Sequence, residues 1–264
     1  MFGMLRALWC YRGFVRSSIR NELVARFARS RLGGLWMIIH PLAQVAIYAL
    51  ILSNVLAAKL PGIDNKFAYA LYLMAGMLAW NLFSEIVGRC LNLFVEQGNL
   101  MKKISFPRIT LPVIVIGSSL LNNVLLFAAL LLVFALLGHA PTVETLWLLP
   151  LTLTVVALAV GIGLVLGVIN VFVRDIGQVM PIILQVWFWF TPIVYPVSIL
   201  SDSIKDMMRF NPLYPIVTAY QNILVYGKSP DLQVITTTAA VALGLLVLGL
   251  FLFRRAAPEM VDSL

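Results

Sequence analysis

The sequence has little charge for its length. Of its 264 residues, 11% are charged and 61% are hydrophobic, whereas an average soluble domain has about 25% charged residues. Long uncharged segments recur along nearly the whole chain, so no part is large enough for a separate soluble domain of ordinary size. This composition excludes an ordinary soluble protein and predicts an all-α integral membrane protein.

Cysteine and histidine are equally scarce. Cys10 and Cys90 are the two cysteines; both fall in segments expected on or near the cytoplasmic side, so no disulfide framework is predicted. His40 and His139 lie in different parts of the predicted topology without a carboxylate cluster beside either, so we expect neither to bind a metal. The sequence has no G-x-S-x-G turn and no paired acids on one helix face. We therefore predict no catalytic residue and no metal site.

A phosphate-binding loop is missing as well. The tripeptide GKS occurs at residues 227–229, but the motif needs a glycine where Asn222 stands. The match also falls on the side predicted to face outward, away from cytosolic ATP. We therefore expect this chain to bind no cofactor, and we expect any ATP to be hydrolysed by a partner.

The net charge of +8 is concentrated in particular loops, which indicates membrane orientation and not nucleic-acid binding. Taking about 20 apolar residues as one crossing, we expect six transmembrane helices, over residues 35–57, 67–87, 109–137, 146–173, 176–200 and 232–253. Fourteen Lys and Arg residues then lie on one side and five on the other. Because positively charged loops stay in the cytoplasm, both termini are predicted to be cytoplasmic.

Residues 210–227 are uncharged but contain Pro212 and Pro215. A seventh crossing here would place Arg254 and Arg255 outside the cell, against the charge count. Non-helical backbone at membrane depth survives only where protein or a water-filled cavity satisfies its polar groups. We therefore predict re-entrant helices between the fifth and sixth spans.

The N-terminal segment, residues 1–33, is predicted to hold an amphipathic interface helix. Four apolar residues follow one another at four-residue steps: Val15, Ile19, Leu23 and Phe27. Three arginines follow the same step about 100° around the helix: Arg12, Arg16 and Arg20. Such a helix is expected to lie in the inner interface, with its arginines on anionic head groups of membrane lipids. The alternative is a solvated basic tail that only fixes orientation.

Glu85 is the one carboxylate well inside a predicted span, and an intramembrane acid is by default a functional hypothesis. The second span runs inward from residue 67, so Glu85 is about 27 Å along a core about 30 Å thick. Arg89 follows one turn later. An ion pair between the two side chains near the inner interface is the simpler interpretation.

Two other features have an ordinary structural interpretation. Gly163 and Gly167 form a G-x-x-x-G pattern in the fourth span, which indicates close helix packing within or between subunits. Arg174 and Asp175 form the inner turn between the fourth and fifth spans. We expect the arginine to mark the inner end of one span and the aspartate to cap the next.

Five segments, in order along most of the chain, resemble the type 2 ATP-binding-cassette export permeases, and within them the polysaccharide branch that exports O antigen, capsule or teichoic acid. The segments are ARSRLGGLWMIIHPL at 28–42, NLMKKISFPRITLP at 99–112, VRDIGQVMP at 173–181, FTPIVYP at 190–196 and NPLYPIVTAYQNILVYG at 211–227. No single segment is decisive, but the five in sequence are specific.

The resemblance implies a six-span permease domain over residues 34–264, with both termini inside, in the bacterial inner membrane. It implies a homodimer bound to two copies of a separate ATPase subunit, which would hold ATP and Mg. The expected substrate is a lipid-linked polysaccharide, with O antigen the first choice. A permease of the same fold for a smaller amphiphile, such as a drug or lipid, is the alternative. A multi-pass membrane enzyme acting on lipid-linked sugars is a different class, which the missing catalytic constellation disfavours.

An inner loop over about residues 96–108 matches the family's coupling helix, which docks in a groove of the ATPase. The matching residues are Asn99, Leu100, Lys102, Lys103 and Phe106. The alternative is a short positively charged loop that merely fixes topology.

An outer gate region over about residues 192–227 matches the family's two short re-entrant helices, which close the export path. Prolines remove backbone donors, so we expect the fifth span to stop inside WFWFTPIVYP at residues 187–196. Aromatic faces suit the C–H faces of sugar rings. The candidate channel or gate residues are Trp187, Trp189, Phe190, Pro192, Tyr195, Pro196, Tyr214, Tyr220 and Tyr226. The alternative for these aromatics is an interfacial belt.

Overall fold

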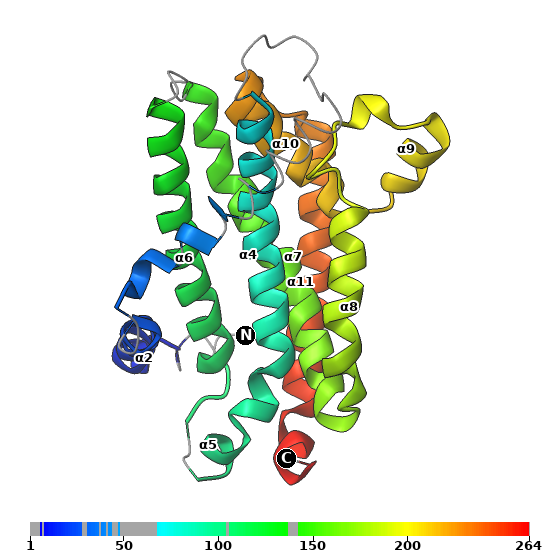
Figure 1. Cartoon of the computed structure of the whole chain (residues 1–264). Helices are drawn as coiled ribbons and strands as arrows, with labels where there is room; N and C mark the ends of the chain where they lie inside the picture. The colour runs from blue at the N-terminus through cyan, green and yellow to red at the C-terminus, as the bar shows by residue number, and fades with distance from the viewer. Residues whose placement is uncertain are drawn as a thin grey trace.

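The computed structural model describes residues 6, 8–27, 31–36, 38–40, 42–43, 47, 68–103, 106–136 and 142–263, and their regular structure is helical (Figure 1). Four helices in this part of the chain are long and apolar enough to cross a membrane. They are α4 (Ala68–Glu96), α6 (Thr110–Leu136), α7 (Leu148–Phe172) and α11 (Leu232–Ser263). The predicted spans over 67–87, 109–137, 146–173 and 232–253 are thus confirmed as long apolar helices.

Shorter elements precede α4 or separate the four long helices along the chain. They are α2 (Arg12–Phe27), η1 (Gly33–Leu35), α5 (Gly98–Lys103), η2 (Val143–Trp147), α8 (Asp175–Trp189), η3 (Val197–Ile199), α9 (Asp202–Met208) and α10 (Leu213–Tyr226). Most of the predicted first span, residues 35–57, lies outside the described residues, as does the loop over residues 58–66.

The long helices run side by side with α8 along them, α2 lies beside α6, and α5, α9 and α10 lie at the ends of the bundle (Figure 1). One end carries α5, the turn between α7 and α8, and the C-terminus; we call it the α5 end. The other end carries α9 and α10; we call it the α9 end. Because α8 finishes and α11 begins at the α9 end, the chain between these two helices leaves and returns on the same side of the bundle (Figure 1).

Helix α4 is the buried centre of the bundle, whereas α6 and α11 leave most of their apolar surface exposed. Leu132 of α6 and Phe251 of α11 are among the exposed large side chains. Hydrocarbon side chains on the outside are stable only where the surroundings are apolar, as in a lipid bilayer.

The G-x-x-x-G pattern packs α7 against α4 within one chain. A Cβ atom at Gly167 would lie 2.4 Å from the carbonyl oxygen of Cys90, and one at Gly163 would lie 2.7 Å from the Cys90 Cβ. Larger residues would therefore force the two backbones apart. Cys90 itself is buried and free, so its role here is packing.

Helix α8 is much shorter than the predicted fifth span over residues 176–200. It has 15 residues and ends at Trp189, which gives about 22 Å at 1.5 Å per residue, less than an apolar core of about 30 Å. The expected stop inside residues 187–196 is confirmed, because turns and bends follow where Pro192 and Pro196 interrupt the backbone ladder.

Candidate functional site

The aromatic run at the end of α8 divides into an inner and an outer pair. The rings of Trp187 and Phe188 contact Phe83 and Trp80 of α4, with centroid distances of 5.1 and 5.4 Å. Trp189 is 50% exposed and Phe190 is 46% exposed. Of the predicted channel aromatics in this run, Trp187 is therefore a packing residue, whereas the following two rings are accessible.

Side chains from other helices hold the broken backbone that follows α8. Tyr72 of α4 donates to the carbonyl oxygen of Pro192 at 3.3 Å, and Gln221 of α10 donates to the same oxygen at 3.0 Å. The hydroxyl of Tyr69 donates to the carbonyl oxygen of Val194. These bonds replace the hydrogen bonds of a regular helix. Side chains of the protein thus satisfy the backbone carbonyl groups, as expected for non-helical backbone at membrane depth.

The broken segment is packed tightly against the bundle. Thr191 and Ile193 are fully buried, and Val194 is 4% exposed. A Cβ atom at Gly76 of α4 would lie 3.2 Å from Cγ2 of Ile193 and 2.9 Å from Nε2 of Gln221. The missing side chain at Gly76 thus gives the broken segment and α10 room to approach α4.

Asn211 connects the end of α8 to the start of α10. Its Oδ1 accepts from Nε1 of Trp187 at 2.9 Å and from the backbone amide of Leu213 at 3.0 Å. Its Nδ2 donates to Oγ1 of Thr191 at 3.0 Å and to the carbonyl oxygen of Phe190 at 3.2 Å. One amide side chain therefore fixes both sides of the loop that carries α9.

The four predicted tyrosines have different environments. Tyr220 is 1% exposed, and its hydroxyl lies 2.7 Å from Oγ1 of Thr152. This burial assigns Tyr220 to the packed core and removes it from the surfaces that a substrate can touch in this conformation. Tyr195, Tyr214 and Tyr226 are half-buried, so part of each ring is accessible.

The α9 end also exposes an aromatic ring that the sequence argument did not select. Phe210 is 90% exposed and lies two residues after the end of α9 at Met208. Helix α9 contains an ion pair: Lys205 donates to Asp202 at 2.9 Å, and this contact lowers the pKa of the Asp202 carboxyl. Phe210 lies within the predicted outer gate region, but its exposure depends on how α9 is folded and is not encoded locally.

The predicted coupling residues lie at the opposite end of the bundle, on and after α5 (Figure 1). Asn99 and Lys102 are exposed. The side chains of Leu100 and Lys103 lie outside the described set. The ring of Phe106 lies 6.0 Å from that of Phe14, which precedes the apolar stripe of α2. The inner loop and the N-terminal helix are therefore in direct contact.

Arg89 joins three helices near the α5 end. The predicted pair with Glu85 is confirmed at 3.6 Å, but the shorter contact is with Glu22 of α2 at 2.6 Å. Arg89 also donates to Ser118 at 2.7 Å and to Ser119 at 3.1 Å, both on α6. The side chains of Arg89 and Glu22 are 23% and 27% exposed, so this ion pair is largely shielded.

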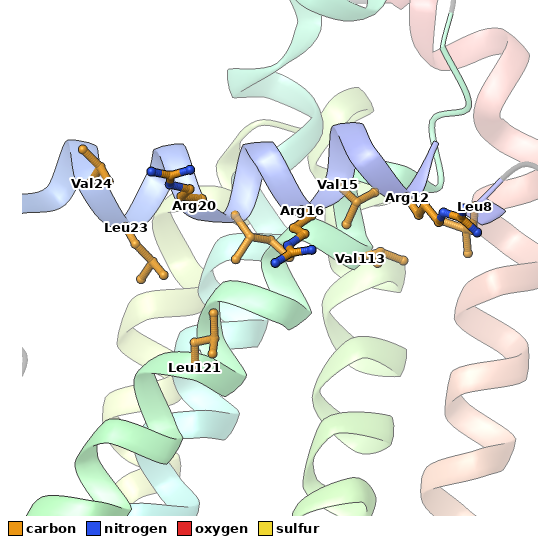
Figure 2. A pocket seen from close by; sticks show the side chains of 10 residues that line it. Leu8, Arg12, Val15, Arg16, Arg20, Leu23, Val24, Val113 and Leu121 are labelled. Atoms are coloured by element: carbon orange, nitrogen blue, oxygen red, sulfur yellow. The ribbon is translucent and has the colours of Figure 1, made fainter. Parts of the chain in front are cut away.

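Helix α2 runs across α6 and not along it (Figure 2). Val15, Ile19 and Leu23 of its apolar stripe are half-buried, and the side chain of Phe27 is outside the described set. A Cβ atom at Gly117 of α6 would lie 2.4 Å from Cδ1 of Ile19. Gly117 therefore provides the recess that receives the centre of the stripe.

The three arginines predicted for the interface helix are exposed on α2: Arg12, Arg16 and Arg20. They border a cavity between α2 and α6 (Figure 2). The amphipathic pattern thus has the expected two sides, one packed on the bundle and one accessible.

The inner turn is exposed at both Arg174 and Asp175, and α8 begins at Asp175. The predicted aspartate cap is wrong in detail. Oδ1 of Asn170 in α7 accepts from the backbone amide of Gly177 at 2.8 Å, and it is this residue that supplies the side-chain bond to the first turn among the described residues. Asn170 also donates to the carbonyl oxygen of Leu91 at 3.0 Å, which links the turn to α4.

Sequence reasoning missed most of the polar residues that connect neighbouring helices within each end of the bundle. Ser118, Ser119 and Asn122 stand inside an otherwise apolar predicted span, and polar residues there are costly unless they have partners. This cost could have indicated from the sequence that these three residues have polar partners on other helices. For Tyr69 and Tyr72, no sequence signal distinguishes them from interfacial tyrosines.

Comparison with known proteins agrees with this architecture. Residues 14–225 match the family described as ABC-2 type transporter. The chain is 29% identical to an O-antigen export system permease protein of Myxococcus xanthus, with 100% of both chains aligned. It is 25% identical to a protein of the same description from Klebsiella pneumoniae, over 92% of both chains. It is 24% identical to a polysialic acid transport protein of Escherichia coli, over 94% of this chain and 95% of that protein. The chain therefore belongs to the ABC-2 type transporter family, as a multi-pass membrane permease component.

Proposed function

We propose that this chain is the permease subunit of an ATP-driven exporter that moves a lipid-linked polysaccharide, O antigen first, across the bacterial inner membrane to the periplasmic side. The similar proteins from Myxococcus xanthus and Klebsiella pneumoniae are described as O-antigen export permeases, and the one from Escherichia coli as a polysialic acid transporter. Their common cargo is a long sugar chain, which is the substrate class assigned here.

The observation that carries the proposal is the interrupted backbone after α8 with accessible rings beside it. Trp189, Phe190 and Phe210 are exposed at the α9 end, next to a segment whose carbonyl groups are held by Tyr72 and Gln221. Sugar C–H faces pack on aromatic rings without a fixed sequence requirement. Such a surface suits a polymer that slides past a gate.

We assign the α9 end to the periplasmic side and the α5 end, with both termini, to the cytoplasm. The assignment is supported by charge. Lys102, Arg174 and Arg254 are at or near the α5 end, and the basic residues of the other end are fewer. The assignment takes residues 35–57 as the first of six spans and α10 as re-entrant. The permease domain is then residues 34–264, with the interface helix before it.

Members of this family work with an ATPase partner that binds the nucleotide, and we propose that two copies of it serve a homodimer of this chain. The coupling surface is α5 and the loop after it. Phe106 contacts Phe14, and Glu22 pairs with Arg89. Movement of the loop against the ATPase would thus reach α4 and α6 by way of α2.

The homodimer is supported by the outer face of α8. Only Met180 and Phe188 are buried in this helix, and Ile182, Val186 and Trp189 are among its exposed apolar residues. A path between two copies has room for a polymer, which a single six-helix bundle lacks.

The proposal is tested in a strain of the source bacterium that lacks this chain. Loss of the surface glycan, with its lipid-linked precursor retained on the cytoplasmic side, is expected, and the wild-type chain should restore export. Normal export without the chain would refute the assignment. Co-purification of the tagged chain should recover an ATPase subunit; a chain that transports by itself would refute the two-component arrangement.

The alternative of a smaller amphiphile is tested in the same strain. Unchanged surface glycan together with impaired efflux of a drug or lipid would favour it. A membrane enzyme acting on lipid-linked sugars would instead change the chemical structure of the precursor and not its location.

A further inference from the structure

Helix α2 leaves an apolar groove between itself and α6. The groove has a volume of about 670 Å³. Val15, Ile19 and Leu23 line it from α2, and Val113 and Leu121 line it from α6 (Figure 2). Apart from three arginines, the described residues that line the groove have hydrocarbon side chains. The described part of its floor therefore offers a surface for another hydrocarbon and no partner for a polar group.

Arg12, Arg16 and Arg20 border this groove at intervals of one helical turn. All three are exposed. Arg12 lies 4.6 Å over the ring of Trp9, and no ion pair to Arg16 or Arg20 occurs within the part of the chain that the structure describes. A row of cations thus stands beside an apolar floor, and no carboxylate is among the described residues that line it.

We propose that the groove binds an anionic glycerophospholipid of the inner leaflet. One acyl chain would lie on Val113 and Leu121, and the phosphate group would contact Arg16 and Arg20. The complementarity of charge selects this occupant, because anionic head groups are enriched at the cytoplasmic surface and attract basic residues there. A peptide strand fits less well, since its backbone polar groups would face a floor without donors or acceptors.

The bound lipid would act as a structural ligand of α2. Ile19 contacts Gly117 at the centre of the helix, and the lipid would fill the remaining space on the side of the arginines. Because α2 also contacts Phe106, occupancy of the groove would steady the helix that touches the predicted coupling loop. This inference depends on the membrane location of the family and on the position of α2 against α6. It does not depend on the identity of the exported substrate.

The test is lipid titration of the purified full-length chain by native mass spectrometry, with phosphatidylglycerol and with phosphatidylcholine. The variant R16Q/R20Q removes two cations from the rim. The variant V113F fills the floor without a change in charge. The matched control R174Q/R255Q removes two exposed arginines from the α5 end that do not line the groove.

We expect one phosphatidylglycerol per chain in the wild type and in the R174Q/R255Q control. R16Q/R20Q is expected to bind it about 25-fold more weakly, at about fivefold for each arginine near an anionic head group, and V113F is expected to lose it. Equal binding by R16Q/R20Q and the wild type would overturn the proposal, as would equal binding of phosphatidylcholine.

If V113F keeps the lipid while R16Q/R20Q loses it, the lipid is attracted to a charged surface only. That result would also overturn the proposal that the groove binds it. If R16Q/R20Q does not fold, a salt titration of the wild type decides the matter. The site is supported if phosphatidylglycerol binding weakens as salt is added while binding of a neutral lipid does not change. Phosphatidylglycerol binding that does not depend on salt refutes it. Cross-linking of Leu121→Cys to a second copy or to an ATPase would show that protein occupies the groove.

Discussion

The contact between Glu22 and Arg89 gives a prediction about how α2 is held on the bundle. Arg89 pairs with Glu22 at 2.6 Å and bonds Ser118 and Ser119 of α6. Glu22→Gln removes the charge and keeps the size of the side chain. Arg89→Met removes all of these bonds and leaves Glu22 and Glu85 without their shared cation. We expect both variants to release α2 more often while the rest of the bundle stays folded.

The magnitude follows from the burial of the pair. Exposed ion pairs contribute about 0–1 kcal/mol, and removing one partner of a buried pair costs about 3–5 kcal/mol. The side chains of Arg89 and Glu22 are 23% and 27% exposed, which is between these cases. We expect a loss of about 1.4 kcal/mol for Glu22→Gln, or tenfold in the opening equilibrium. Arg89→Met also loses hydrogen bonds to α6, so we expect about 2.7 kcal/mol, or a hundredfold.

Amide hydrogen exchange measures this opening directly. In the reconstituted chain, the amides of Arg12–Phe27 should exchange about ten times faster in Glu22→Gln, whereas those of α7 should not change. Glu96→Gln, which changes an exposed carboxylate at the end of α4, is the matched control and should leave α2 unchanged. In the Glu22→Gln/Arg89→Met double variant, the effects should be less than additive. Unchanged exchange in α2, or an equal increase in α7, would refute the role of the Glu22–Arg89 pair in holding α2.

Three further predictions concern packing and the gate. Gly167→Ala should lower the melting temperature in detergent, because the new methyl group would lie 2.4 Å from a backbone carbonyl oxygen and overpacking costs about 1–3 kcal/mol. The control Gly244→Ala, whose methyl group would meet nothing within 4 Å, should not destabilise the protein. Gln221→Leu should weaken the broken segment by about 0.5–1.5 kcal/mol, because the buried carbonyl of Pro192 loses one donor and keeps Tyr72; export should fall while ATPase assembly persists, and normal export would contradict the assigned role. Trp189→Ala should reduce polymer export without lowering the melting temperature, whereas Trp187→Ala should lower the melting temperature as well. Equal effects of the two tryptophan variants on stability would contradict the division into outer and inner rings.

Local chemistry in the sequence was sufficient to predict the long helices and the end of the helix that precedes the proline-rich segment. Uncharged segments of about 20 residues predict helices because lipid cannot satisfy backbone groups, and α4, α6, α7 and α11 follow that rule. The stop after Trp189 follows from two prolines, since each one lacks a donor. The pair of Glu85 and Arg89 follows from helical spacing, because residues four apart share one face.

Contacts between distant segments were decided only in the tertiary structure. The spacing of Arg89 indicated Glu85, but the shorter partner is Glu22, 67 residues away, and only the crossing of α2 over α6 brings them together. Tyr220 matched the other aromatics of the gate region by type and position, yet the packing of α10 against α7 buries it on Thr152. Sequence fixes what each residue can bind, because that depends on its own chemistry. Which partner it meets depends on how the helices pack, and no local pattern records that.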